Sequence, residues 1–389
     1  MPYITRQMKI GNSSQVRQLS LEAGAVYSSA VKTFWRVFRK KNHWLSLKDM
    51  QKIVRNNNLH SQSVQGITQT FYEALKSWNA LRRKNPSARP PRKHRLFHPI
   101  PFKESAIKIK DDMLILSTGR GNEPVIIPWK FDKPKFCEIS YKLNEFVLNA
   151  VYQKEAQVQK SEGEVAAGVL IGRTHIGAAY LGKNTHIANG RELRSKYLYK
   201  DKMHESFNSK MDKCEKNSRK WKRLEQARRR ILNNINNQIK DILHKQTTAL
   251  VCAMKEHNVQ TVGIGYMRNI QMDNGCVESL RVLDHHAPLS KVREMIAYKA
   301  TFAGIKVRHI DDDIIKHACP VCVEHNEPDD LTYLCKLCGF QSHRYCVGAV
   351  NINHFTKYRE HVPVVGDMTP PVGIRYYADS LRKSAASVA

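Results

Sequence analysis

The segment Cys319-Pro320-Val321-Cys322 is followed, after twelve residues, by Cys335-Lys336-Leu337-Cys338, and then by His343-Arg344-Tyr345-Cys346-Val347-Gly348-Ala349-Val350-Asn351-Ile352. Two pairs of cysteines, with two residues inside each pair, have the spacing of a tetrahedral Zn²⁺ site. Buried free thiols are the alternative, but paired spacing of this kind rarely arises by chance. The sequence therefore predicts a zinc ribbon whose ligands are Cys319, Cys322, Cys335 and Cys338.

The two cysteine pairs differ in the residue that follows them. Gly339 follows the second pair and can adopt the left-handed turn that such a knuckle favours. Val323 follows the first pair, and a β-branched residue is a poor choice for positive φ. We therefore expect the first knuckle to weaken zinc binding.

The charge balance points to a polyanionic partner. The 389 residues include 64 Lys and Arg against 35 Asp and Glu, a net charge of +29. Such an excess, spread along a whole chain, favours nucleic acid binding. An acidic membrane surface is the alternative, but no apolar run approaches the roughly 18 residues of a spanning helix. We expect two or three domains and no membrane partner.

The first residues, Met1-Pro2-Tyr3-Ile4-Thr5-Arg6, lack the apolar core of a signal peptide. The protein is therefore expected to stay in the cytosol with reduced thiols. Five cysteines outside the quartet are scattered along the chain, and this odd number favours unpaired thiols over a disulfide framework.

The N-terminal part predicts helices followed by a small β region. Apolar residues recur every three or four positions between residues 14 and 83, and Ser46 stands where a helix N-cap would. Residues 84–95 are too rich in proline for a helix and too basic to be buried, so we expect a charged linker or arm. Short β-branched runs separated by turn residues predict strands within residues 107–128.

The rest of the chain alternates strands with helices. Residues 165–172 and 177–181 predict a buried strand and its hairpin partner, and residues 211–257 predict one long helix. Strands are expected again at residues 259–265 and 305–310, with a helix between them, so the sequence predicts a mixed sheet.

Basic residues cluster in two places. Nine Lys or Arg lie within residues 213–230, and others lie in the proline-rich arm. A merely solvated face is the alternative, but phosphate contact better explains this density. The residues expected to contact nucleic-acid backbone are Arg89, Arg92, Lys93, Arg95, Lys213, Lys216, Arg219, Lys220, Lys222, Arg223, Arg228, Arg229 and Arg230.

The order of these elements resembles TnpB, the transposon-encoded RNA-guided nuclease related to type V CRISPR effectors. The motifs that carry the resemblance are Gly168-x-x-x-Gly172, Asn217-Ser218-Arg219-Lys220-Trp221, Tyr298-Lys299-Ala300 with Gly304-Ile305, the cysteine quartet, and Ala349-x-Asn351-Ile352. The resemblance spans nearly the whole chain. It implies an α/β multidomain protein: an RNase H-like (RuvC) domain with an inserted zinc ribbon, and a small wedge-like β-barrel with an inserted helical recognition lobe.

The resemblance also implies where the domains lie. The β-barrel halves are expected at residues 1–20 and 97–140, with the helical recognition lobe and basic linker at 21–96 between them. The remaining parts are expected to be the RuvC-like domain at 141–315, the zinc ribbon at 316–342, a final RuvC-like helix at 343–359 and a flexible tail at 360–389.

Nuclease chemistry in this family needs acids, because carboxylates hold the two Mg²⁺ ions that flank the scissile phosphate. The first acid belongs third in G-x-D-x-G, where this chain has Leu170. The second belongs at the end of a later strand, where Gly265 stands, or in one branch on the next helix, where Thr301 stands. The third belongs at Tyr345. The resemblance thus implies a nuclease-fold pseudoenzyme without catalytic Mg²⁺.

Other acids could replace them. Asp311, Asp312 and Asp313 end a predicted strand just before the ribbon, and Glu294 lies on a predicted helix. Aspartates at a strand end more often form a solvated turn or helix cap, so relocated catalysis is the weaker interpretation.

A TnpB-like protein that cannot cut could still use a guide RNA to bind complementary double-stranded DNA beside a short flanking motif. Binding over a promoter would exclude RNA polymerase and repress transcription, in the cytoplasm of a bacterium and on its nucleoid. Ser63, Gln65 and Gln69 lie on a segment that resembles the recognition helix of the family and could contact base edges of the motif. Ordinary solvent-facing residues are an equal alternative for each of them.

Two other functions stay open at this level. One is an active Mg²⁺-dependent RNA-guided DNA endonuclease with relocated acids. The other is a guide-independent regulator that binds DNA through the zinc ribbon and the basic helix. A decaying gene product is a third possibility, but the preserved hydrophobic periodicity and the complete cysteine quartet argue against it.

Overall fold

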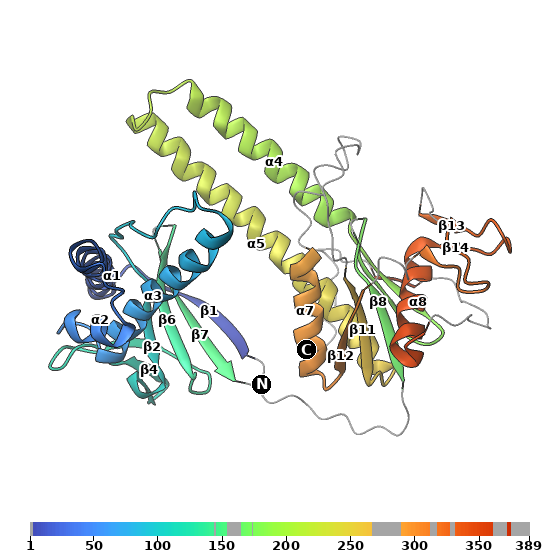
Figure 1. The fold of residues 1–389 in the computed structure, drawn as a ribbon, viewed down its shortest axis with the longest axis horizontal. Helices are drawn as coiled ribbons and strands as arrows, with labels where there is room; N and C mark the ends of the chain where they lie inside the picture. The colour runs from blue at the N-terminus through green and yellow to red at the C-terminus, as the bar shows by residue number, and fades with distance from the viewer. Residues whose placement is uncertain are drawn as a thin grey trace. The chain divides into compact units, whose positions relative to one another are not determined.

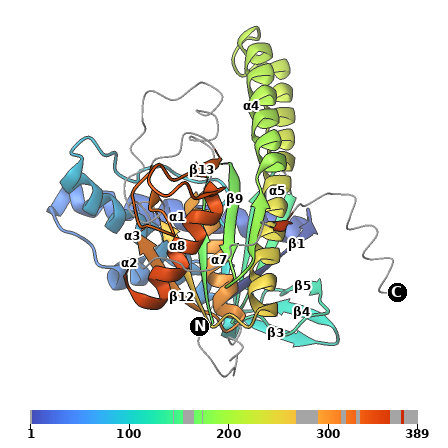
Figure 2. The ribbon, with the colours of Figure 1, turned by 90° about the vertical axis from the view of Figure 1, so that its right-hand side faces the viewer.

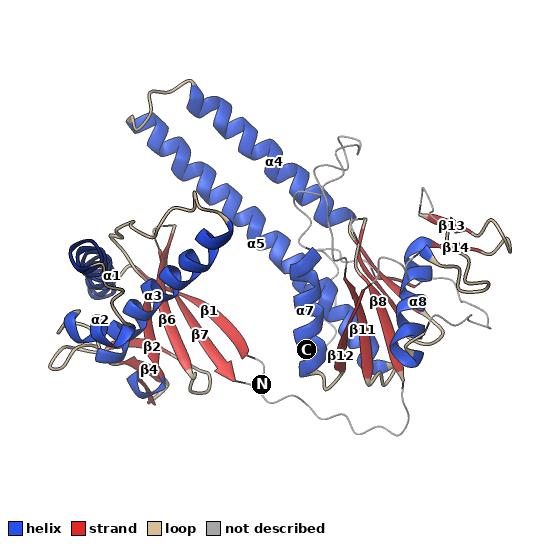
Figure 3. Cartoon of the chain, viewed as in Figure 1, coloured by secondary structure: helices blue, strands red, loops and turns tan. Residues whose placement is uncertain are grey.

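The computed structural model describes residues 3–143, 145–153, 165–172, 174–266, 289–311, 317–326, 331–360 and 372–374. The chain forms two compact units, one essentially Tyr3–Lys154 and the other Glu155–Ala389 (Figure 1). Both units combine helices with strands (Figure 3), which confirms the α/β multidomain class. Among the described residues, none of the helices has the length and apolar character needed to cross a bilayer.

The first unit contains two antiparallel sheets. The strands of the four-stranded sheet are, in spatial order, β1 (Tyr3–Gly11), β7 (Glu145–Gln153), β6 (Phe136–Lys142) and β2 (Ile100–Lys103). The three-stranded sheet contains β3 (Ile107–Lys110), β4 (Met113–Leu116) and β5 (Val125–Pro128), which confirms the strands predicted within residues 107–128.

Strand β7 moves the expected boundary between the first two domains. It pairs with β1 along its length, from Tyr3 opposite Gln153 to Gly11 opposite Phe146, and it also pairs with β6. Its inward-facing residues are buried in the core of the first unit: Phe146, Leu148 and Ala150. The boundary expected at residue 140 is therefore wrong, and the first unit extends to Lys154.

Three helices are inserted between β1 and β2, namely α1 (Ser14–Lys41), α2 (Leu47–Ile53) and α3 (Ser61–Lys84). The helices predicted between residues 14 and 83 are confirmed, and α1 begins at Ser14, before the start at residue 21 expected for the recognition lobe. The predicted cap is also confirmed, because the Ser46 hydroxyl accepts a hydrogen bond from the Asp49 amide at 3.2 Å. The apolar stripe of α3 packs into the core of the unit.

The second unit is built on a six-stranded mixed sheet. In spatial order its strands are β12 (Lys306–Asp311), β11 (Thr261–Tyr266), β8 (Ala166–Leu170), β9 (His175–Tyr180), β10 (Thr185–Asn189) and β15 (Val372–Ile374). Strands β12, β11 and β8 are parallel, β9 and β10 continue as antiparallel neighbours, and β15 is parallel to β10. The predicted mixed sheet is confirmed.

Strand β15 lies within the segment expected to be a flexible tail. Its three residues pair with His186, Ile187 and Ala188 of β10, so this part of the tail is an edge strand. The rest of the tail beyond residue 360 lies outside the described residues.

Helices cover both faces of the six-stranded sheet. Helices α5 (Arg219–Glu256) and α7 (Leu289–Phe302) pack on one face, and α8 (Arg344–Tyr358) packs on the other (Figure 1). The α8 backbone approaches β8 so closely that a Cβ atom at Gly168 would lie 2.1 Å from the Ala349 carbonyl oxygen. The Asn353 amide fixes this contact by donating to the Ala166 carbonyl at 2.6 Å.

The single long helix predicted for residues 211–257 is wrong in its first part. Helix α4 (Arg191–Asp212) ends there, and after a short turn α5 runs back beside it, so the two form a hairpin that extends beyond the sheet (Figure 2). Asn217 adopts a φ of 70°, and the Ser218 hydroxyl caps α5 by accepting from the Trp221 amide at 3.2 Å. The sequence does carry a signal for this break, because residues 215–220 are all polar and Ser218 is a favoured N-cap residue.

His98 lies buried between the helices and β2. Its ring stacks on Tyr27 at 4.8 Å, Nδ1 donates to the Pro99 carbonyl at 2.7 Å, and its own carbonyl accepts from the Ser20 hydroxyl. Burial, with a smaller contribution from the Arg95 charge, lowers the pKa of His98 from 6.5 to about 4.

We therefore expect acid to destabilise the first unit as the pH falls from 6.5 towards 4. The unfolded chain binds a proton at His98 in this range and the folded chain does not, which costs about 3 kcal/mol at most. Tryptophan fluorescence reports this unit because it holds four of the five tryptophans: Trp35, Trp44, Trp78 and Trp129. His98→Gln should flatten the pH profile, whereas His94→Gln, at an exposed position, should not. A profile that His98→Gln leaves unchanged would contradict this assignment.

Candidate functional site

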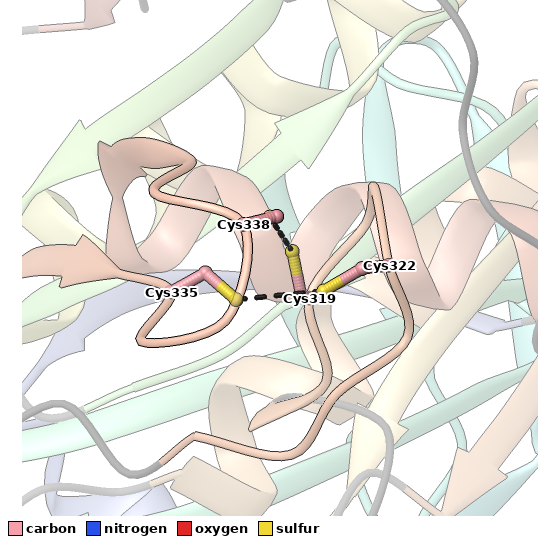
Figure 4. A group of neighbouring side chains, drawn as sticks. All are labelled: Cys319, Cys322, Cys335 and Cys338. Atoms are coloured by element: carbon pink, nitrogen blue, oxygen red, sulfur yellow. Dashed lines mark hydrogen bonds between the residues drawn. The ribbon is translucent and has the colours of Figure 1, made fainter.

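The four predicted cysteines meet in one cluster (Figure 4). Their sulfur atoms all lie within 4.8 Å of one another, with 3.7 Å between Cys319 and Cys338 and 3.5 Å between Cys322 and Cys335. Zn–S bonds of about 2.3 Å in a tetrahedron separate the sulfurs by about 3.8 Å. The cluster therefore has the size and ligand chemistry of a zinc site.

The two knuckles use the same backbone hydrogen bonds. In the first, the Cys319 amide donates to the Glu324 carbonyl at 2.8 Å and the Val323 amide donates to the Cys319 carbonyl at 2.9 Å. The residues sixteen positions later make the same pair of bonds in the second knuckle. Both knuckles end in a left-handed residue, with φ of 65° at Val323 and 72° at Gly339. The first knuckle thus forces a valine into a conformation that β-branched residues avoid.

Two residues near the cluster carried no signal in the sequence. The Asn326 side-chain amide lies 3.5 Å from the Cys335 sulfur and donates to the Tyr333 hydroxyl at 3.2 Å. Both side chains are buried, and the Tyr333 hydroxyl donates in turn to the His317 carbonyl. A donor aimed at a cysteine sulfur stabilises the thiolate that a metal binds. Spacing rules could not find Asn326, because it lies outside both cysteine pairs.

We predict that Val323→Gly stabilises the ribbon by about 1 kcal/mol, because glycine adopts this φ without strain. Since zinc binding and ribbon folding are linked, zinc should bind several-fold more tightly. Competition against a chromophoric chelator measures this affinity. Gly339→Val is the matched reverse change and should weaken binding. Equal affinities for the three proteins would show that the left-handed positions carry no strain.

Three of the four positions at which the resemblance implies acids come together beside α8. Leu170 ends β8, and Gly265 stands on the neighbouring strand β11, one residue beyond the registered pair of Ile264 and Val169. Tyr345 lies in the first turn of α8, and Leu170 and Tyr345 belong to one buried apolar cluster. Thr301 lies apart from them on α7, where its hydroxyl donates to the Ala297 carbonyl.

The Tyr345 side chain fits closely against the turn between β8 and β9. Its hydroxyl oxygen accepts hydrogen bonds from the amides of Thr174 at 3.1 Å and His175 at 3.4 Å. A Cβ atom at Gly172 would lie 2.1 Å from this oxygen. The phenol therefore fills the space beside the strand end and satisfies two backbone donors there.

Two histidines complete this environment. The His175 ring contacts those of Tyr345 at 4.9 Å and His343 at 5.4 Å. Burial, with smaller contributions from His343 and Arg191, lowers the pKa of His175 to about 4. At neutral pH the titratable groups described beside Tyr345 are the neutral imidazoles of His175 and His343, whereas Mg²⁺ prefers carboxylate oxygens.

The alternative acids lie elsewhere or outside the described residues. Asp311 ends β12 opposite Tyr266, two strands away from β8. Glu294 is exposed on α7. Asp312 and Asp313 lie outside the described part of the chain.

Leu170 and Gly348 share one space between β8 and α8. A Cβ atom at Gly348 would lie 2.6 Å from a methyl group of Leu170. Since α8 is fixed to the sheet by the Asn353 hydrogen bond, the helix cannot retreat to admit a larger residue without losing that bond. The leucine at 170 thus needs a glycine at 348.

We predict a strong energetic coupling between these two positions. Gly348→Ala alone should destabilise α8 by about 1 to 3 kcal/mol through overpacking. In a Leu170→Ala background the added methyl enters vacated space, so the same change should cost little or stabilise. Hydrogen exchange of the α8 amides measures the local stability. Leu250→Ala, on the opposite face of the sheet, is the control background. In it, Gly348→Ala should destabilise α8 as much as it does in the wild type. Additive effects at 170 and 348 would refute the shared space.

Lys299, which the sequence marks only as part of a motif, joins α7 to α5. Its ammonium donates to the His244 carbonyl at 2.5 Å and to the hydroxyls of Thr247 and Thr248 at 2.7 Å each. Burial lowers the pKa of Lys299 to about 8. The lysine acts as a hydrogen-bonding bridge between two helices on the face opposite α8.

The motif-reading residues proposed on α3 need one correction. Ser63 is 0% exposed, because it lies four residues before Ile67 on the apolar stripe of the helix. It cannot contact DNA bases. Gln65 and Gln69 are exposed, and the Gln69 amide donates to Glu73 at 3.0 Å.

The basic cluster of residues 213–230 lies at the turn of the α4–α5 hairpin and in the first turns of α5. Eight of its nine Lys and Arg side chains are exposed, as phosphate contact requires. The exception, Arg228, is half-buried and is held by Glu225 and Asn208. Arg228 is therefore a structural residue of the hairpin, and Arg229 also pairs with Glu225.

Comparisons with known proteins fit this architecture. The IS605 OrfB family model, described as a probable transposase, matches residues 149–271, and the model of the Cas12f1-like TNB domain matches residues 290–352. No curated protein matches the sequence.

Two solved structures share the fold at low sequence identity. A Cas12f1-sgRNA-target DNA complex is 12% identical, with a TM-score of 0.58 over 87% of this chain and 82% of that chain. The mini-RNA-guided endonuclease CRISPR-Cas_phi3 is 10% identical, with a TM-score of 0.51 over 95% of this chain and 93% of that chain.

The chain is therefore an α/β multidomain protein that shares the fold of the Cas12f1 and CRISPR-Cas_phi3 structures and carries a four-cysteine cluster compatible with a zinc ribbon. The matches to the IS605 OrfB and Cas12f1-like TNB models support a TnpB-like protein, as the motifs implied.

Proposed function

We propose that this protein binds a guide RNA, uses it to bind complementary double-stranded DNA beside a short flanking motif, and represses transcription by excluding RNA polymerase without cutting. The observation that carries the proposal is the packing of Leu170 and Tyr345 into one apolar cluster beside α8. In the TnpB pattern both positions hold acids. Here they stabilise the contact between the sheet and the helix, and neither side chain can hold Mg²⁺.

The basic surfaces support retained binding. The exposed members of the 213–230 cluster and of the proline-rich arm offer cations to phosphates without specifying sequence. The related Cas12f1 structure is a complex with an sgRNA and a target DNA. An RNA and a DNA duplex are therefore the partners proposed for this chain, and Gln65 and Gln69 are the residues proposed to contact the flanking motif.

Zinc on the four cysteines is proposed as a structural element of this site. The Asn351 amide of α8 donates to the Ala318 carbonyl, directly before Cys319, at 2.7 Å. A metal that orders the ribbon would therefore also brace the middle of α8, the helix that carries Tyr345. The proposed zinc ion would stabilise the protein when it binds nucleic acid and would not activate water.

The test uses the protein purified with its copurifying RNA. We expect sequencing to reveal a defined RNA, and we expect the complex to bind a matching duplex tightly and leave it intact in Mg²⁺ or Mn²⁺. A reporter with the match over its promoter should lose expression in cells, and one with the match far downstream of the gene should not.

Each competing function gives a different result. Metal-dependent cleavage of the matching duplex, abolished by Asp311→Ala, would support relocated acids and sink the proposal. Sequence-specific DNA binding that survives removal of all RNA would support a guide-independent regulator.

A further inference from the structure

The proline-rich arm of the first unit is held in place on the surface of α1. Its backbone makes hydrogen bonds with side chains from the helical region: the Trp78 and Trp35 indoles donate to the Ala88 and Pro91 carbonyls at 2.9 and 3.1 Å. Ser28 exchanges hydrogen bonds with the backbone of Arg95. The segment of residues 84–95 is charged and exposed as expected, but these hydrogen bonds fix it along the helices, and we call it the strap.

The contact with α1 is close from Ser20 to Trp35. A Cβ atom at Gly24 would lie 2.1 Å from the Leu96 carbonyl oxygen, and Ser20 bonds to the backbone of His98. Ser20, Gly24 and Ser28 recur every four residues, so small side chains form a track on one side of the helix for the strap.

Aromatic rings beneath the strap hold three arginine side chains. Arg92 lies over Trp35 at 4.8 Å, Arg95 over Tyr27 at 4.7 Å, and Arg82, at the end of α3, over Trp78 at 4.8 Å. Trp35 and Tyr27 are buried, at 6% and 4% exposure, so their positions are set by the core. The arginines themselves are exposed.

The charge around the strap is of one sign. Between Glu73 and Glu104 the sequence holds nine Lys and Arg and no Asp or Glu. Within the described residues, none of the three ring-held arginines forms an ion pair. These cations are not neutralised by ion pairs within the described part of the unit. Their concentration therefore indicates that they bind an anion from another molecule.

We propose that the strap is a preformed clamp for the phosphodiester backbone, in which Trp35, Tyr27 and Trp78 are positioning residues for Arg92, Arg95 and Arg82. A ring that covers one face of a guanidinium leaves its N–H edges free, and these edges match phosphate oxygens in a bidentate geometry. Because the rings fix the side chains before binding, less conformational entropy is lost on contact. The inference deepens the proposed function, since the phosphates would belong to the guide RNA or the target DNA.

The experiment compares charge with geometry at exposed positions, where the fold is not at risk. Arg92→Gln with Arg95→Gln removes two charges, whereas Arg92→Lys with Arg95→Lys keeps them but loses the planar fork. Lys108→Gln with Lys110→Gln, on exposed β3 residues, is the matched control for lost charge. Binding is measured against salt concentration, in separate arms for the guide RNA, for the matching duplex offered to the assembled complex, and for unrelated single-stranded RNA and duplex DNA.

We expect the glutamine pair to bind roughly tenfold or more weakly and to lose about one to two from the slope of log K against log salt. The lysine pair should also bind several-fold more weakly but keep the slope, because its charge is intact. The control pair should match the wild type. The nucleic acid for which the glutamine pair loses affinity, guide RNA or DNA duplex, is the one that the strap binds.

Two results would overturn the clamp. If the lysine pair binds like the wild type, only charge matters and the rings position nothing. If the glutamine pair binds like the wild type in every arm, the strap contacts no nucleic acid. Binding to the unrelated RNA and DNA does not depend on a guide, so it tests the clamp separately. If the wild-type protein carries no guide RNA, the proposed function is refuted. The salt slopes measured with the unrelated RNA and DNA would still show whether the strap binds phosphates.

Discussion

The approach of α8 to the backbone of β8 is the contact on which the second unit depends. Gly168 permits it by leaving no Cβ atom between the strand and the helix, and Asn353 secures it with a buried hydrogen bond. From this fixed helix, Asn351 reaches the first knuckle and Tyr345 reaches the turn after β8. One helix therefore sets the relation between the sheet and the cysteine cluster.

In the first unit, many basic residues lie close together on the surface around the strap. Like charges repel, and few carboxylates are available near the strap to neutralise them. Neutral aromatic rings contact the arginines where carboxylates would otherwise pair with them. The face of a ring attracts a guanidinium without cancelling its charge. His98 is kept neutral by burial beneath Tyr27, so it adds no further repulsion to Arg95.

Local chemistry decided what could be predicted from the sequence. The zinc knuckles, the helix cap at Ser46 and the central strands follow from spacing, capping and apolar runs, which act over a few residues. The break before Ser218 was missed because the Lys and Arg residues around it are good helix formers, although Asn217 adopts positive φ there. Strand β15 is only three residues long and gains its identity from pairing with β10.

Tertiary contacts explain the remaining differences. Ser63 is polar, and only its place on the stripe of Ile67 shows that it is buried. Asn326 becomes important because it reaches Cys335, and the strap arginines because Trp35 and Tyr27 lie below them. In each case the partner is distant in sequence or lies outside any motif, so no local pattern could reveal it.

The fit between Leu170, Gly348 and Tyr345 also constrains how this protein can change. An aspartate introduced at 345 would leave the Thr174 and His175 amides without their acceptor, and one at 170 would face the apolar cluster of α8. Each single step towards an acidic centre therefore lowers stability before it could provide any chemistry. The packing of the sheet against α8 therefore disfavours single aspartate substitutions at both positions.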